Sequence, residues 1–188
     1  MTGSAGRTGV DVRLARTADA TALLALQHRL DAQSPFMLLE PGEREVTPDG
    51  LRARLATQTQ QASYDLVAEQ DPTTLVGWAA VEVLPYRRAA GTGYVVIGVD
   101  ASASGQGVGA ALLRAAAAES AARGLHRLEL TVMTDNLRAV GLYLREGFVV
   151  EGVRRAALHR GGCRVDEYYM ARLLTATQPP VELGAAPR

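Results

Sequence analysis

The sequence contains no lysine, and all 20 of its basic residues are arginine. Without lysine, the chain cannot form a Schiff base and cannot supply the lysine of a Walker-type phosphate loop. A single cysteine, Cys163, excludes an internal disulfide and a metal site built from cysteines alone. The 20 arginines are balanced by 20 acidic residues, so the net charge gives no reason to expect a nucleic acid or an anionic membrane as a partner.

Long apolar runs are missing too, since none approaches the roughly 18 residues of a membrane-spanning helix. The first nine residues, MTGSAGRTG, contain no apolar segment of the kind found in secretory signals. We therefore expect a cytoplasmic protein with no membrane partner. The length of 188 residues and the hydrophobic fraction of 47% predict one globular domain with a proper core. Small and polar residues at 1–9 and proline-rich residues at 175–188 predict flexible tails on a domain that spans 10–174.

Hydrophobic periodicity predicts strands and helices in the order β-α-α-β-β-β-α-β-α-β-β, which is typical of an α+β domain on a mixed sheet. Thr17 and Thr47 are the expected N-caps of the first two helices, and Pro48 suits the first position of the second. The expected strands cover residues 10–15, 63–70, 75–86, 92–100, 125–133, 147–159 and 164–174. The expected helices cover residues 17–33, 47–61, 107–123 and 136–146.

The stretch SGQGVG contains Gly105, Gly107 and Gly109, between a predicted strand and an alanine-rich helix. Glycines at such a place let a ligand or another backbone approach closely. A Walker-type loop is excluded by the missing lysine. A dinucleotide-binding turn is disfavoured, although GQGVGA fits its pattern, because DASAS separates the strand from the first glycine and the chain ends in a hairpin. Two interpretations stay open: backbone amides that hold a pyrophosphate at the helix start, and a turn that only tightens packing.

A second motif, NLRAVGLYLREGF, carries Asn136, Ala139, Leu142, Tyr143, Gly147 and Phe148. Together with VDASASGQGVGAALL, this motif resembles the GNAT superfamily of acetyl-CoA-dependent N-acetyltransferases. The loop of that family is written Q/R-x-x-G-x-G/A, and its later helix N-x-x-A-x-x-L-Y-x-x-x-G-F. The helix here matches at every one of these positions, whereas the loop has Ser104 where the family prefers Arg or Gln. The resemblance extends over about residues 10–174, including the strand order.

The resemblance implies an α+β GNAT fold: a central mixed, mostly antiparallel sheet of about seven strands, flanked by four helices and splayed between strands four and five. It also implies that the pantetheine arm of coenzyme A pairs with the fourth strand as an added strand, at Ile97, Gly98 and Val99. Gly98 marks either a bulge in that strand or a close contact with a packed helix. The pyrophosphate would lie on the loop and the helix start, at Ser104, Gly105, Gln106, Gly107, Val108 and Gly109.

Asn136 and Tyr143 are seven residues apart, which places them on one face of a helix because about 700° of rotation is close to two full turns. The resemblance implies that Asn136 binds the pantetheine arm and that the Tyr143 hydroxyl points at the sulfur. Each residue also has a structural interpretation. Asn136 is a natural helix N-cap, and Tyr143 could be an ordinary core residue.

The chemistry that the resemblance implies is direct attack of a primary amine on the thioester of acetyl-CoA in a ternary complex. A backbone N–H near Val99 would stabilise the oxyanion, and Tyr143 would protonate the departing thiolate. The amine needs a base, and TGYVVIGV carries no acid, so Glu82 on the preceding strand is the candidate; a solvent-facing role is the alternative. Glu43 could contact a cationic substrate, but a solvated loop charge is favoured there.

Acetyl-CoA is thus the expected co-substrate, and no metal is expected, because His28, His126 and His159 show no metal-binding spacing. The expected partner is an amine of unknown identity, and the chain could form a homodimer. The alternative function is a non-catalytic acyl-CoA-binding or sensor domain, which would keep the glycines but would need neither Tyr143 nor a base.

Overall fold

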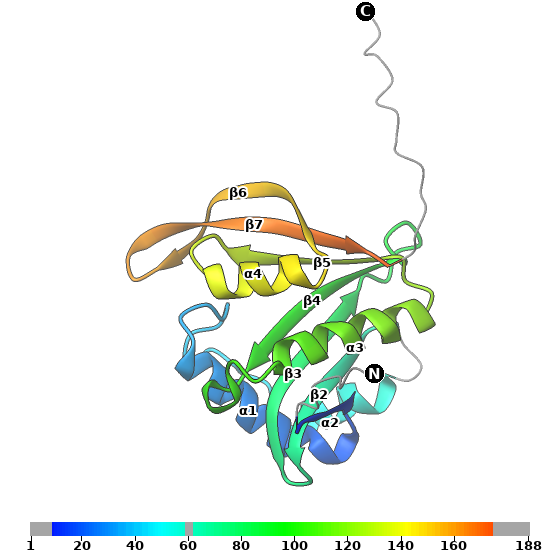
Figure 1. Ribbon diagram of the computed structural model, residues 1–188. Helices are drawn as coiled ribbons and strands as arrows, with labels where there is room; N and C mark the ends of the chain where they lie inside the picture. Colours follow the sequence, from blue (N-terminus) through cyan, green and yellow to red (C-terminus); the bar gives the residue numbers. More distant parts are fainter. Residues whose placement is uncertain (1–8, 59–61, 175–188) are drawn as a thin grey trace, which may run out of the picture.

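The computed structural model describes residues 9–58 and 62–174 and forms one seven-stranded sheet with four α-helices (Figure 1). The predicted tails fall mostly on residues 1–8 and 175–188, which lie outside the described residues. The strands are β1 (Asp11–Leu14), β2 (Tyr64–Asp71), β3 (Thr74–Val83), β4 (Thr92–Val99), β5 (Arg127–Met133), β6 (Val149–Arg160) and β7 (Cys163–Leu173). The helices are α1 (Ala20–Gln33), α2 (Pro48–Thr57), α3 (Val108–Ala122) and α4 (Leu137–Arg145), with short 3₁₀ turns η1 (Thr17–Asp19) and η2 (Ala101–Ala103).

The strands lie in the order β1-β2-β3-β4-β5-β7-β6, and every neighbouring pair is antiparallel except β4 and β5. The parallel pairing of β4 with β5 covers only residues 92–94 and 127–129. Beyond Tyr94 the two strands diverge (Figure 1). A hydrogen bond of 2.8 Å between the Tyr94 hydroxyl and Thr131 Oγ1 spans the strands just past the last backbone pair. The predicted α+β sheet, with its splay between strands four and five, is therefore confirmed.

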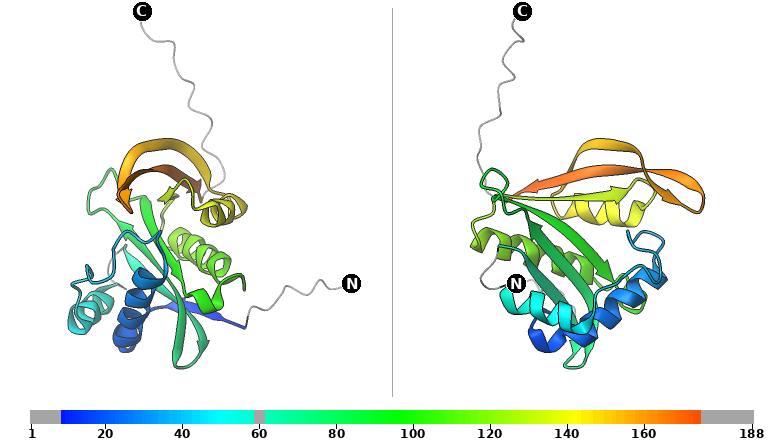
Figure 2. Two further views of the ribbon diagram at one scale, coloured as in Figure 1. Left: turned by 90° about the vertical axis from the view of Figure 1, so that its left-hand side faces the viewer. Right: turned by 180° about the vertical axis from the view of Figure 1, so that it is seen from behind.

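Helices cover both faces of the sheet: α1 and α2 lie on one side, and α3 and α4 on the other (Figure 2). Strand β3 is buried on both faces, as its nearly continuous apolar run LVGWAAV requires. Its Ala79 and Val81 pack in the core with α3, whereas Trp78 and Ala80 pack in the core with α1 and α2. Each face of the sheet thus has its own helix layer, and the splay opens along the sheet between β4 and β5.

The two predicted N-caps turn out differently. Thr47 caps α2 as expected, because its Oγ1 accepts a hydrogen bond of 3.1 Å from the Gly50 N–H. The prediction for Thr17 is wrong, since Thr17 opens the turn η1 and α1 begins only at Ala20. The carboxylate of Asp19 accepts the Arg16 N–H and two bonds from Arg13, and this arrangement stabilises a separate turn ahead of the helix.

Candidate active site

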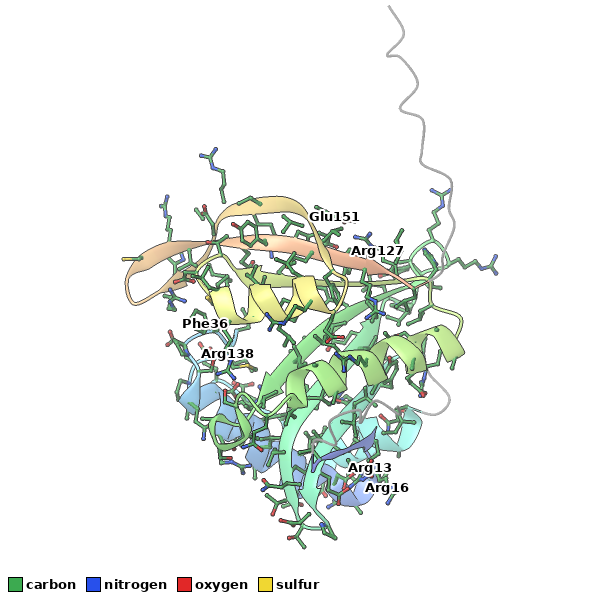
Figure 3. All side chains as sticks on the ribbon, in the orientation of Figure 1. Arg13, Arg16, Phe36, Arg127, Arg138 and Glu151 are labelled. Atoms are coloured by element: carbon green, nitrogen blue, oxygen red, sulfur yellow. The ribbon has the colours of Figure 1, made fainter. Side chains whose placement is uncertain are left out.

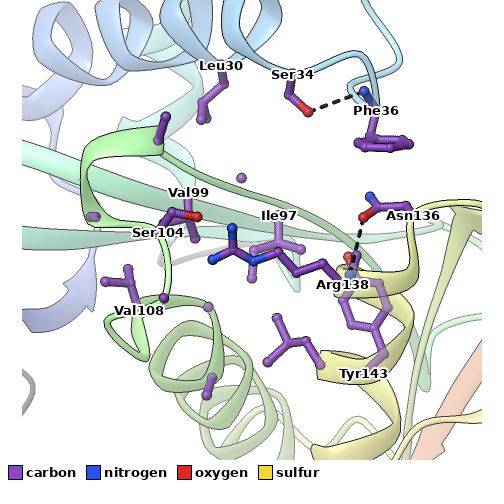
Figure 4. Close-up of a pocket in the computed structure, with 18 of the residues that line it drawn as sticks. Leu30, Ser34, Phe36, Ile97, Val99, Ser104, Val108, Asn136, Arg138 and Tyr143 are labelled. Carbon is purple, nitrogen blue, oxygen red and sulfur yellow. Dashed lines mark hydrogen bonds between the residues drawn. The ribbon is translucent and has the colours of Figure 1, made fainter.

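A cavity of about 910 Å³ lies where β4 and β5 diverge (Figure 4). Its walls come from the end of α1 and the following loop, the end of β4, the β4–α3 loop, the start of α3, and α4. Nearly all of the predicted coenzyme A residues line it: Ile97, Gly98, Val99, Ser104, Gly105, Gly107, Val108, Gly109, Asn136 and Tyr143. Two motifs that lie some 30 residues apart in the sequence therefore face each other across one cavity.

The free edge of β4 borders this cavity. The Asp100 N–H donates to the Val76 carbonyl at 2.8 Å, and the β3–β4 register continues without a shift to Gly98 opposite Trp78. Because hydrogen-bonded and non-bonded pairs alternate in an antiparallel ladder, the N–H and C=O groups of Ile97 and Val99 point away from β3. They point toward the gap, where β5 no longer pairs with β4.

Of the two alternatives for Gly98, the bulge is absent, because the β3–β4 register runs through this position without a shift. A Cβ atom at this position would lie 2.6 Å from Leu30 Cδ1, so the missing side chain lets α1 pack directly against β4. The alternative interpretation, a close contact with a packed helix, is what the structure shows. Leu30 also lines the cavity, so this contact sets the distance between α1 and the free β4 edge.

The loop between β4 and α3 needs its glycines for two separate reasons. Gly105 and Gly107 have φ values of +80° and +84°, in the left-handed region that favours glycine. Gly109 lies inside the first turn of α3, where a Cβ atom would come within 2.9 Å of Leu142 Cδ2 on α4. The first amides of α3 have no carbonyl of their own helix to bond, and they open onto the cavity together with the positive end of the helix dipole. The close packing of α3 against α4 and the free backbone amides suited to an anion therefore occur together at the start of α3.

Asp100 organises the start of this loop. Its carboxylate accepts hydrogen bonds from the N–H and the hydroxyl of Ser102, at 3.0 and 2.8 Å, and from Arg29 Nε of α1 at 3.0 Å. Burial alone would raise the pKa of Asp100, but these hydrogen bonds outweigh it and the pKa lies below its ordinary value. A second bond, from the Ala101 N–H to Gln33 Oε1, also ties the loop to α1.

Tyr143 projects from α4 into the wall of the cavity and is buried, with 7% of its surface exposed. Its ring lies 5.9 Å from that of Phe148, with the two planes tilted by 58°. Burial, with a smaller contribution from nearby Tyr94, raises the pKa of the Tyr143 hydroxyl well above its ordinary value. The hydroxyl therefore carries its proton throughout the neutral range.

Asn136 is both an N-cap and a cavity residue. Its Oδ1 accepts the Ala139 N–H at 3.2 Å and so caps α4, as its structural interpretation predicts. In Figure 4 the side chain faces the cavity between Phe36 and Arg138.

Three arginines of the cavity wall were not anticipated: Arg114, Arg138 and Arg145. Arg114 forms a two-bond pair with Glu146, at 2.9 and 2.7 Å. Arg138 is exposed and extends from α4 toward Ser104 on the β4–α3 loop (Figures 3 and 4). One of its Nη atoms lies 3.9 Å from where a Cβ of Gly105 would be. A cation thus lies beside the loop position where Ser104 replaces the family's Arg or Gln, and that departure was the signal that could have prompted a search for one.

Gln106, Glu82 and Glu43 do not line the cavity. Gln106 Nε2 bonds the Ser102 carbonyl at 3.0 Å within its own loop. Glu82 is exposed near the end of β3, opposite Tyr94 in the register, on the sheet face shared with α1 and α2. Glu43 accepts the Glu40 N–H at 2.8 Å within a turn, consistent with the favoured interpretation of a loop charge.

Comparison with known proteins adds the family. The model of the acetyltransferase (GNAT) family matches residues 26–148. The chain belongs to the GNAT family. The match includes both the glycine loop and the α4 motif, so the sequence resemblance is confirmed.

Within residues 9–58 and 62–174, no three His, Cys, Asp or Glu side chains are grouped to hold a metal ion. No helix in the described part of the chain is both long and apolar enough to cross a membrane.

The relatives of this GNAT chain include a mycothiol acetyltransferase of Jonesia denitrificans, 29% identical over 171 residues, which are 90% of this chain and 46% of that protein. The L-amino acid N-acetyltransferase AaaT of Escherichia coli is 47% identical over 47 residues, 25% of this chain and 29% of AaaT. The matched segments thus cover less than half the length of each of these curated relatives.

Solved structures agree on the fold. A GNAT-family acetyltransferase from Streptococcus pneumoniae superposes with a TM-score of 0.83 at 28% identity, covering 87% of this chain and 99% of that one. The structure of yncA from Salmonella typhimurium, solved with its cofactor acetyl-CoA, has a TM-score of 0.80 at 19% identity over 93% of this chain and 99% of that one.

Proposed function

We propose that this GNAT-family protein is an N-acetyltransferase that moves an acetyl group from acetyl-CoA to a primary amine in a ternary complex. The observation that carries the proposal is the opening between β4 and β5. It leaves the β4 edge free beside the amides that begin α3, and Tyr143 lies in the wall of the same cavity.

Acetyl-CoA, as co-substrate, fits this cavity on three counts. The N–H and C=O groups of Ile97 and the C=O group of Val99 are free to pair with the amides of a pantetheine arm, as a strand added at an open edge would. The N–H group of Val99 remains for the oxygen of the thioester. The amides at Val108 and Gly109 suit a pyrophosphate at a helix start. Arg138 supplies a positive charge beside the loop residues Ser104, Gly105, Gln106 and Gly107.

The proposed reaction forms one C–N bond and breaks one C–S bond. The neutral amine attacks the thioester carbonyl, and a backbone N–H at Val99 stabilises the oxygen as it becomes negative. Tyr143 gives its proton to the departing thiolate sulfur and takes a proton back from the solvent afterwards. Burial keeps its hydroxyl protonated before the reaction begins. The amine loses its proton to Glu82 through water molecules, because Glu82 lies outside the lining of the cavity. The products are the N-acetylated amine and coenzyme A with a free thiol.

The proposed location is the cytoplasm. The proposed partner is an amine and not a nucleic acid or a membrane, because 20 arginines are balanced by 20 acidic residues. A homodimer stays a prediction, which light scattering of the purified chain would check.

The decisive experiment follows thiol release from acetyl-CoA with and without a panel of primary amines, together with mass spectrometry of the amines. We expect thiol release that depends on the amine and matches the yield of N-acetyl product. A domain that only binds acyl-CoA would bind acetyl-CoA in calorimetry and release no thiol with any amine. Absence of acetyl-CoA binding would overturn the proposal as a whole.

A further inference from the structure

The end of the cavity that faces α1 is apolar. It is lined by Leu30 of α1 and by Pro35, Phe36 and Met37 of the loop that follows, with the uncharged Gln33 and Ser34 beside them. Among the described residues that line the cavity, the one carboxylate is that of Glu146, which Arg114 already holds with two bonds. A second positive charge on an acceptor would therefore find no free carboxylate among these residues.

The loop that carries these apolar side chains is held in place. Arg44 bonds Asp31 of α1 through two hydrogen bonds of 2.7 and 2.9 Å, and the two side chains are 10% and 2% exposed. Nearer the cavity, Ser34 Oγ accepts the Phe36 N–H at 3.2 Å (Figure 4). A buried ion pair of this geometry fixes the path of the chain, so the apolar wall exists before any ligand binds.

Phe36 also contacts the other half of the domain. The guanidinium of Arg160, near the end of β6, lies 5.1 Å from the centre of the Phe36 ring. Arg160 is itself held by an ion pair with Asp135 and by a contact of 3.2 Å with Met133 Sδ. The α1–α2 loop and the β6–β7 hairpin therefore touch at Phe36, which lines this end of the cavity.

We propose that the acceptor is a small primary amine with an apolar side chain and no second positive charge, and that Phe36 determines this specificity. The inference rests on the proposed function, because it assigns the acceptor of the same site. Burying an ammonium group against Leu30, Phe36 and Met37 without a carboxylate partner is unfavourable, whereas burying a methyl group there is favourable. The contact between Phe36 and Arg160 further disfavours acceptors as large as a folded protein surface.

The test compares n-pentylamine with 1,4-diaminobutane, which have the same number of non-hydrogen atoms and differ in a terminal methyl or ammonium group. With the 188-residue chain and saturating acetyl-CoA, we expect kcat/KM for n-pentylamine to exceed that for 1,4-diaminobutane by about tenfold or more. Phe36→Asp is expected to reverse this order, and Phe36→Leu to keep it. The KM for acetyl-CoA in both variants, with their thermal unfolding, serves as the control for an intact fold and an intact coenzyme A site.

The outcomes separate the two proposals. Turnover with a preference for 1,4-diaminobutane, or a preference that Phe36→Asp leaves unchanged in a folded protein, overturns the apolar acceptor site and leaves the acetyltransferase proposal standing. If neither amine is turned over, calorimetry of each amine against the protein saturated with coenzyme A decides. Binding of n-pentylamine that Phe36→Asp abolishes supports the apolar site, and its absence in the unmodified protein overturns the site.

Discussion

Tyr143 combines burial, which a core residue also has, with a place in the wall of the cavity, which the packing interpretation does not require. The substitution Tyr143→Phe keeps the ring against Phe148 and removes only the hydroxyl. If this hydroxyl protonates the thiolate, turnover should fall by about 10² to 10⁴, the usual contribution of general acid catalysis. The KM for acetyl-CoA should change little, because the lost interaction matters chiefly in the transition state. Steady-state kinetics would measure both quantities.

Single-turnover kinetics separate the catalytic role of Tyr143 from a packing role. Because burial raises the pKa of Tyr143, the hydroxyl should stay protonated, and the rate ratio between the original protein and Tyr143→Phe should stay constant as the pH rises from about 6 to 10. The matched control is Tyr86→Phe, at an exposed tyrosine outside the cavity. A loss below about threefold in single-turnover experiments with folded Tyr143→Phe would favour packing alone.

Arg138 is the second residue-scale test, since it brings a cation to the loop at Ser104. We expect Arg138→Gln to weaken acetyl-CoA binding about tenfold, or ~1.4 kcal/mol, by removing a charge close to the phosphates. The matched control is Arg155→Gln, an exposed arginine on β6 outside the cavity.

Calorimetry with acetyl-CoA would measure the affinity of the Arg138 variant. S-acetyl-pantetheine, which has no pyrophosphate, gives the discriminating comparison because its affinity should be the same with and without Arg138. An equal loss for both ligands would show that Arg138 acts on the shape of the cavity and not on the phosphates.

At the scale of elements, the start of α3 approaches α4 as closely as a glycine allows. Gly109→Ala would place a Cβ atom 2.9 Å from Leu142 Cδ2, so the Leu142 side chain, the helices or the loop must shift. We expect acetyl-CoA affinity to fall about tenfold or more, because the α3 amides move with the loop. Calorimetry on the folded variant would measure the loss.

The double variant Gly109→Ala/Leu142→Ala separates packing from ligand approach. Removing the Leu142 side chain relieves the contact with the new Cβ, and coupling between neighbouring sites shows as a departure from additivity. If the double variant regains full affinity relative to Leu142→Ala alone, Gly109 is needed for helix packing. If the affinity stays low, the ligand itself needs the space beside Gly109.

For the whole molecule, Asp65 joins elements that the sheet alone does not connect. Asp65 is buried, with 1% of its surface exposed. Its carboxylate accepts hydrogen bonds from Arg54 of α2 and, at 2.8 Å, from Trp78 Nε1 of β3. Its backbone N–H donates a hydrogen bond to Gln58 Oε1. Asp65→Ala should lower the free energy of unfolding by roughly 1.5–3 kcal/mol, because the buried Trp78 N–H loses a charged acceptor. Denaturant unfolding would measure this, and Asp11→Ala on the exposed side of β1 is the control. A change no larger than that of the control would show that Trp78 finds another acceptor.

The sequence predicted much of the architecture because the signals involved are local. Thr47 and Asn136 each cap a helix by accepting a hydrogen bond from the backbone N–H three residues later, as expected of N-cap residues. The prediction for Thr17 failed because Arg13, outside the helix, binds Asp19 and separates a turn from α1. The choice between the two alternatives at Gly98 also depended on a distant residue: Leu30, from an element 68 residues earlier, occupies the space that a side chain at this position would need.

The sequence by itself determined the order of the elements, the family, and the placement of Gly105 and Gly107 in the loop between a strand and a helix. Hydrophobic periodicity and glycine-containing turns depend on near neighbours in the chain. Only the tertiary structure decided where the cavity has its charge and its apolar end. Arg138 lies beside Ser104, and Arg160 lies over Phe36, because α4 and the β6–β7 hairpin stand across the splay from the loops that they face. Such contacts join residues more than 30 positions apart, and no periodicity or spacing in the sequence specifies them.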